Sequence, residues 1–294
     1  MKSLDHYSGP ARVVFDQISP SVNGGDFPVK RPLGESLTVL AHAIADGHDL
    51  LDVVLAHRRQ GARQWHEIPM RELGNDEYAG TFSPEAIGIY EYRIIGWSDP
   101  FLNWHVGFIK KSDSGDENIG VELDIGAELV RAASRRARGK EGRQLSEWAD
   151  YLGDHSEDLL EKVAFARKDD FFKTVRNYPD RSHQTVSDVF RLMVEREKAY
   201  FSTWYEFFPR SCADDPTRHG TFKDACGRFP EIARMGFNVV YFPPIHPIGR
   251  IFRKGKNNAL QASEDDVGSP WAIGSAEGGH KSILPELGNM DGFK

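Results

Sequence analysis

The sequence predicts a multidomain protein: an N-terminal immunoglobulin-like β-sandwich, a helical domain, and the start of an incomplete (β/α)8 barrel. Three stretches with different apolar patterns predict it. Up to about residue 109, apolar residues occupy every second position in short segments that turn residues separate. From about 117 to 198 they recur at helical spacing, and after that they follow a strand–helix–strand pattern. We therefore place the domains at residues 10–112, 117–198 and 199–294.

The first stretch contains several short strands. Between Glu35 and Ala45, apolar residues at every second position face one side, as in a strand with a buried face. Turn residues separate the further strand candidates, which are 52–58, 64–68, 78–82 and 87–97. Several strands at this spacing within about 100 residues favour a β-sandwich of the immunoglobulin or fibronectin kind.

The second stretch carries apolar residues three and four positions apart. They form three groups: Leu123, Leu129, Val130 and Ala133; Leu159, Leu160, Val163 and Ala164; and Val186, Val189, Phe190, Met193 and Val194. This spacing is typical of helices that bury one face, so we expect a helical domain. The basic residues of 131–143 lack interleaved aromatic residues, which favours a solvated helix face over a nucleic-acid patch.

The third stretch begins a large α/β domain. An aromatic run, 202–208, ends at Pro209 and predicts a buried strand. Residues 222–235 have a helical pattern, and Phe237–Phe242 is a continuous apolar strand. Strand, helix and apolar strand make a βαβ unit of a parallel sheet. A (β/α)8 barrel takes roughly 250 residues, so we expect this domain to be begun but not completed.

Composition excludes several classes of function. The formal net charge is −7, which disfavours nonspecific binding to nucleic acid or to membranes. No apolar run is long enough to span a bilayer, and Met1–His6 is followed by no hydrophobic signal core. Cys212, His219 and Cys226 lack the paired spacing of a zinc site. We expect a cytoplasmic protein with no metal site and no cofactor.

A long loop region follows the strand Phe237–Phe242. Ligands bind at the carboxyl ends of strands in barrels and open α/β sheets, and loops of this length are uncommon unless they are functional. Four cations gather there: Arg250, Arg253, Lys254 and Lys256. They are placed to bind a phosphate, although a solvated basic loop has the same composition.

Two further residues of this region have open roles. His246 could donate a hydrogen bond to a sugar hydroxyl or fill the mouth of the barrel. Trp271 could stack on a sugar ring or pack within the protein. The roles of Arg253 and Lys256 are open as well.

Four segments carry a resemblance to a known family. They are Trp204–Ser211, Gly236–Arg250, Arg253–Asn258 and Gly268–Ser275. Together they closely resemble the bacterial α-1,4-glucan:maltose-1-phosphate maltosyltransferases of the α-amylase superfamily. The strand ending in Pro-Pro-Ile is common to the superfamily, whereas Arg-Lys-Gly-Lys-Asn-Asn and Ser-Pro-Trp-Ala-Ile-Gly-Ser are much more specific to this family.

The resemblance implies a cytoplasmic homodimer that transfers maltosyl units from maltose 1-phosphate to an α-1,4-glucan with retention. It implies a β-sandwich, a helical domain that helps to dimerise, a (β/α)8 catalytic domain and a C-terminal β domain. It also implies that Lys254, the lysine of Arg-Lys-Gly, is a substrate-binding residue that contacts the donor maltosyl phosphate.

The catalytic carboxylates implied by the family follow the middle strands of the barrel, so we expect the nucleophile and the acid/base to lie beyond Lys294. No catalytic role is therefore assigned to Glu206, Glu277 or Asp291, and we expect the chain alone to be inactive. Two other functions remain open: a hydrolase or branching enzyme of the same superfamily, and a non-catalytic glucan-binding or dimerisation module.

Overall fold

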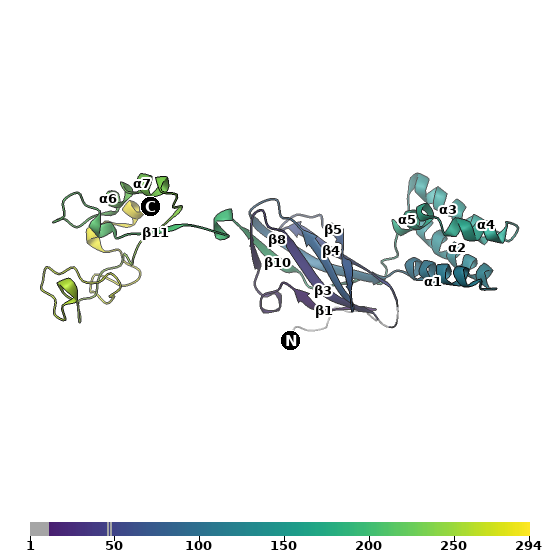
Figure 1. The fold of residues 1–294 in the computed structure, drawn as a ribbon, viewed down its shortest axis with the longest axis horizontal. Coiled ribbons are helices and arrows are strands. Elements are labelled where there is room, and N and C mark those ends of the chain that lie inside the picture. Colours follow the sequence, from purple (N-terminus) through teal and green to yellow (C-terminus); the bar gives the residue numbers. More distant parts are fainter. Residues whose placement is uncertain (1–11, 46, 48) are drawn as a thin grey trace. The chain divides into compact units, whose positions relative to one another are not determined.

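The computed structural model describes residues 12–45, 47 and 49–294. The segment Met1–His6 and the first residues of the predicted sandwich, 10 and 11, lie outside the described residues. The chain divides into two compact units, Met1–Glu197 and Lys198–Lys294 (Figure 1).

The first unit contains two β-sheets within its described residues. The four-stranded sheet has the order β1 (Val13–Ser19), β3 (Leu37–Ala45), β7 (Glu77–Phe82), β6 (Arg71–Gly74). The six-stranded sheet has the order β2 (Val29–Pro32), β10 (Phe190–Glu195), β8 (Gly88–Ser98), β4 (Leu51–Arg59), β5 (His66–Pro69), with β9 (Thr185–Val186) paired to β8. Neighbouring strands are antiparallel except for β2 and β10, which are parallel.

The two sheets share one hydrophobic core. The alternation predicted for 35–45 is confirmed in β3, where every second residue from Leu37 to Ala43 is buried. These side chains belong to the same buried cluster as Leu55 of β4, Tyr92 of β8 and Leu192 of β10. Period-two burial is what a strand with one core-facing side requires.

The strand pattern predicted up to residue 109 ends earlier, at Ser98. Helix α1 (Pro100–Ser114) follows at once because Asp99 caps it: the Asp99 carboxylate accepts hydrogen bonds from the backbone N–H groups of Phe101 and Leu102. Proline at the first helical position after an aspartate is a common helix start. The predicted boundary at residue 112 therefore falls inside a helix.

The remaining helices of this unit pack with α1. They are α2 (Ile119–Arg136), α3 (Gly139–Gly153), α4 (Leu159–Ala166) and α5 (Asp169–Arg176). Their shared core includes Phe108, Leu123, Leu145 and Phe171, each at most 1% exposed. The helical spacing predicted for 123–133 is confirmed in α2, which buries Leu123, Val130 and Ala133.

The helix predicted over 186–194 is wrong. Residues 185–195 form the strands β9 and β10, and the green ribbon of β10 lies among the purple and blue strands in Figure 1. Phe190, Leu192 and Val194 alternate into the sheet core, a period-two pattern that the same residues carry beside the helical one. Pairing with β8 and β2 satisfies the backbone and decides between the two patterns.

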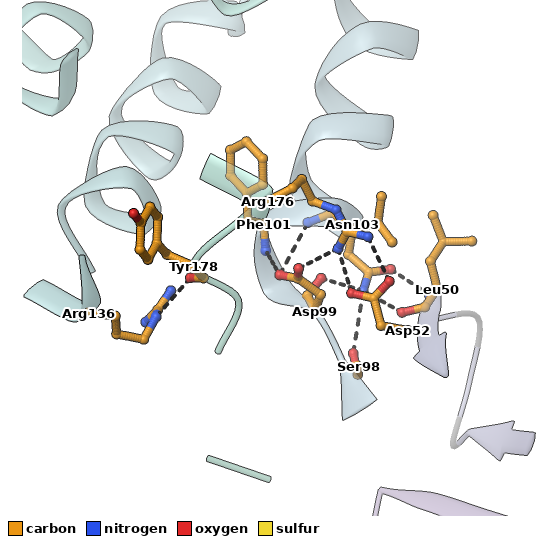
Figure 2. A network of polar contacts seen from close by, with 10 residues as sticks. Leu50, Asp52, Ser98, Asp99, Phe101, Asn103, Arg136, Arg176 and Tyr178 are labelled. Carbon is orange, nitrogen blue, oxygen red and sulfur yellow. Dashed lines mark hydrogen bonds and ion pairs between the residues drawn. The ribbon is translucent and has the colours of Figure 1, made fainter. Parts of the chain in front are cut away.

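A polar junction joins the helices to the six-stranded sheet (Figure 2). Arg176, the last residue of α5, donates two hydrogen bonds of 2.6 Å to Asp52 of β4 and one of 2.6 Å to Asp99. Asn103 of α1 donates to the backbone carbonyl oxygen of Leu50. The junction connects the start of α1 and the end of α5 to the start of β4 and the end of β8.

The second unit holds the predicted strand–helix–strand order. β11 (Trp204–Glu206) pairs in parallel with β12 (Val239–Tyr241), and α6 (Phe222–Cys226) and α7 (Phe229–Arg234) lie between them in sequence. The helix predicted over 222–235 is thus divided, because α6 ends at its C-cap Gly227 and Pro230 opens a new helix.

Short elements complete the fold. They are the 3-10 helices Asn23–Gly25, Glu197–Ala199, Pro209–Ser211, Lys256–Asn258 and Pro285–Leu287, and the helix α8 (Met290–Phe293). Within the described residues, no helix has both the length and the apolar character that crossing a membrane requires.

Candidate functional site

A pocket of about 400 Å³ lies in the second unit. Phe208 and Arg210 line it from the segment after β11, and residues from 254–258 and from 265–271 line it from the loops after β12. The pocket is therefore built by residues that follow the carboxyl ends of two parallel strands. Ligands bind at this edge in parallel α/β folds.

Lys254 lines the pocket with an exposed side chain. Among the residues that the structure describes, none forms a hydrogen bond or ion pair with its ammonium group. Arg210 also lines the pocket, but it donates a hydrogen bond of 2.9 Å to the carbonyl oxygen of Gly268. Burial lowers the pKa of Arg210. Lys254 is thus a cation available to an anionic ligand.

Arg253, the neighbour of Lys254, is engaged by the backbone. Its guanidinium donates to the carbonyl oxygens of Ile248 (2.9 Å), Gly249 (3.0 Å) and Asp266 (3.0 Å). These bonds tie the turn at 248–253 to the segment around Asp266. Arg253 thus braces the loop, since its guanidinium is shared among three backbone carbonyl oxygens.

Arg250 is directed elsewhere. It donates a hydrogen bond of 2.8 Å to Glu277, and this bond lowers the pKa of the Glu277 carboxyl group. Arg250 is absent from the lining of the 400 Å³ pocket, which contains Lys254 and Lys256. The predicted group of four cations is therefore split, and two of the four reach the pocket.

Asp266 lines the same pocket, although no pattern in the sequence predicts it. It is 7% exposed, and its Oδ2 accepts a hydrogen bond of 2.8 Å from the backbone N–H of Ser263. That backbone N–H, and the nearby ammonium and backbone N–H of Lys256, lower the pKa of the Asp266 carboxyl group. Oδ1 has no partner of ordinary hydrogen-bond geometry among the described residues. In the sequence, nothing distinguishes Asp266 from its neighbour Asp265.

Comparison with known proteins identifies the family. The family model for α-1,4-glucan:maltose-1-phosphate maltosyltransferase, domain N/S, matches residues 11–196. The chain belongs to this family. The match covers the four-stranded and six-stranded sheets and helices α1 to α5, whereas the pocket lies in the second unit.

Relatives named α-1,4-glucan:maltose-1-phosphate maltosyltransferase are similar to this chain over both units. The protein from Methylacidiphilum infernorum is 48% identical over 294 residues, all of this chain and 44% of that protein. Those from Chlorobaculum tepidum and Myxococcus xanthus are 43% and 44% identical and cover 98% and 96% of this chain. The chain spans about 43% of the length of these two relatives.

Trp271 lines the pocket, and about half of its surface is exposed. It is 56% exposed, and its ring meets Phe208 edge to face at 5.8 Å. The contact with Phe208 holds the indole in place, and its remaining surface is available to a flat apolar ligand face.

His246 is buried away from the pocket lining. It is 8% exposed, its Nδ1 donates to the carbonyl oxygen of Pro247 at 3.0 Å, and its ring packs against His280 at 5.6 Å. These contacts are those of a residue packed within the protein. Across the described ranges, no group of three or more His, Cys, Asp or Glu side chains is arranged to hold a metal.

Proposed function

We propose that the protein containing this chain transfers maltosyl units from maltose 1-phosphate to an α-1,4-glucan, and that Lys254 binds the phosphate of the donor. The carrying observation is the exposed ammonium of Lys254, which lines the pocket and has no hydrogen-bond or ion-pair partner among the described residues, while the neighbouring Arg250 and Arg253 are engaged. A lysine ammonium forms strong charge-assisted hydrogen bonds with phosphate oxygens. The relatives' names include this donor and acceptor.

The sugar part of the donor has a matching surface in the same pocket. Trp271 offers the exposed part of an indole ring, which is suited to the apolar face of a glucose unit. The transfer itself is a double displacement with retention, in which a nucleophilic carboxylate and a carboxylic acid act in turn. We assign neither carboxylate to a residue of this chain.

We also propose the finer architecture and assembly. Two mostly antiparallel sheets around one core support an immunoglobulin-like sandwich within 10–112, extended by residues 185–195. The parallel pair β11 and β12 supports the start of a (β/α)8 barrel within 199–294. The helices within 117–198 expose Ile125 (45%) and Leu160 (76%), which supports a role in a homodimer. A cytoplasmic location accords with the proposed substrates.

The test is the Lys254→Ala variant of a full-length maltosyltransferase that contains this sequence. Release of inorganic phosphate from maltose 1-phosphate in the presence of glucan measures the transfer. We expect a large loss of kcat/KM for the donor. Unchanged kcat/KM with an intact fold would remove Lys254 from the donor site.

A further inference from the structure

We propose that Asp266 is a positioning residue that holds Lys254 in place from both sides, an inference that rests on the proposed function of Lys254. The backbone of Asp266 binds one neighbour of Lys254, and its carboxylate packs against the other. Asp266 itself binds no substrate in this proposal.

The backbone of Asp266 fixes the residue before Lys254. Nη1 of Arg253 donates to the Asp266 carbonyl oxygen at 3.0 Å, and the same guanidinium binds the carbonyl oxygens of Ile248 and Gly249. One rigid, planar group thus links Arg253 to three carbonyl oxygens of the neighbouring backbone.

The carboxylate of Asp266 fixes the residue after Lys254. A Cβ atom on Gly255 would lie 3.0 Å from Oδ2 of Asp266 and 2.4 Å from the carbonyl oxygen of Gln261. Glycine is therefore the residue that fits between them, and the carboxylate lies beside Gly255. Gly255 also donates to the carbonyl oxygen of Ala259 at 2.9 Å.

The turn that follows Gly255 contains two residues in the left-handed region. Asn257 and Asn258 both adopt left-handed backbone conformations, with φ of 53° and 64°. Such conformations cost free energy and persist where the surroundings impose them. The charge of Lys256 lies near the Asp266 carboxylate and favours its ionised form. The ionised carboxylate is the stronger acceptor for the backbone N–H of Ser263.

The Asp266 carboxylate is itself held rigidly. Oδ2 accepts from the backbone N–H of Ser263, and the backbone N–H of Asp266 donates to the carbonyl oxygen of Ser263 at 3.2 Å. Oδ1 is buried and has no regular partner in the described part of the chain, which is unfavourable because a buried charged oxygen loses its hydration. In our proposal, the protein tolerates this unfavourable burial because the carboxylate helps to order the turn around Lys254.

The experiment is a double-mutant cycle in a full-length maltosyltransferase that contains this sequence. We expect Asp266→Ala to raise the KM for maltose 1-phosphate about tenfold and to leave the KM for glucan unchanged. Asp266→Asn should recover part of the loss, because its amide oxygen still accepts the Ser263 N–H. Glu264→Gln is the matched control: an exposed acidic residue two positions away and outside the pocket lining, expected to change KM less than about twofold.

The decisive comparison is made in the Lys254→Ala background. If Asp266 acts through Lys254, adding Asp266→Ala there changes the donor KM by less than about twofold. A full additional tenfold effect overturns the inference and gives Asp266 a role of its own. Should Asp266→Ala fail to fold, the Asp266→Asn cycle is read in the same way. A Lys254→Ala variant with normal donor KM instead refutes the proposed contact of Lys254 with the donor, so the two failures are distinguishable.

Discussion

Arg176 lies 2.6 Å from Asp99, and Asp99 is also the residue that caps helix α1. Asp99 is 1% exposed, and each of its two carboxylate oxygens has a different donor. One oxygen accepts hydrogen bonds from backbone N–H groups of the helix, and the other accepts a hydrogen bond from the guanidinium of Arg176. The fork of Arg176 also binds both oxygens of Asp52 (Figure 2). One arginine thus joins the end of α5, the start of α1 and the strand β4.

Replacement of Arg176 by alanine should destabilise the fold. It leaves the Asp99 carboxylate buried without its counter-ion, which costs about 3 kcal/mol of unfolding free energy. Urea unfolding followed by circular dichroism measures it. Lys173→Ala on the same helix is the control, because its pair with Asp169 is exposed (72% and 92%) and contributes less than about 0.5 kcal/mol. Equal urea midpoints for the two variants would contradict the assignment.

Lys254→Ala should lower kcat/KM for maltose 1-phosphate about ten- to a hundredfold, because it removes a charge-assisted contact of roughly 1.5–3 kcal/mol. Steady-state phosphate release by the full-length enzyme is the measurement. Arg250→Ala is the control, since its guanidinium pairs with Glu277 outside the pocket lining. Equal losses in both variants would indicate a general effect of loop charge.

Arg253→Ala should loosen the loop, because three backbone carbonyl oxygens lose their donor. We expect faster proteolytic cleavage within 243–280, compared with wild type by mass spectrometry of the fragments. Arg253→Lys should not restore resistance, since a single ammonium cannot reproduce the fork. Resistance equal to wild type in the alanine variant would show that the brace is dispensable.

Protonation of His105 should lower the free energy of unfolding in mild acid. Burial lowers its pKa below the ordinary value of 6.5, although its hydrogen bond to the Ala166 carbonyl oxygen opposes the shift. The unfolded chain therefore binds a proton more readily than the folded chain, and stability is lost as the pH falls through 6.5. Urea midpoints between pH 7 and pH 5 should decline less in His105→Gln than in wild type. Identical slopes would refute this contribution.

The chain of 294 residues alone should release no phosphate from maltose 1-phosphate and glucan above a blank without protein. Retaining transfer needs two carboxyl groups about 5 Å apart on either side of the bond that breaks. Among the described residues, the carboxylates lining the pocket are the consecutive Asp265 and Asp266, and Asp266 is buried. Turnover by pure material would show that a catalytic pair exists elsewhere in the chain.

Local patterns by themselves predicted most of the secondary structure. The alternation in Leu37–Ala45 has a single period, and burying its apolar face requires a strand. The end of the strands was predictable in principle, because Asp99 and Pro100 form a helix start whose capping bonds are local. The resemblance in Arg253–Asn258 likewise predicted Lys254 as a substrate-binding residue.

Tertiary structure alone decided the rest. Phe190–Glu195 carries both a helical and an alternating pattern, and the free backbone groups of β8 and β2, more than 90 residues away in sequence, select the strand. Arg253 and Lys254 are adjacent cations with equal charge in the sequence. Only the folded loop brings three carbonyl oxygens to Arg253 and leaves the ammonium of Lys254 in the pocket, because hydrogen-bond partners are set by the path of the chain in space.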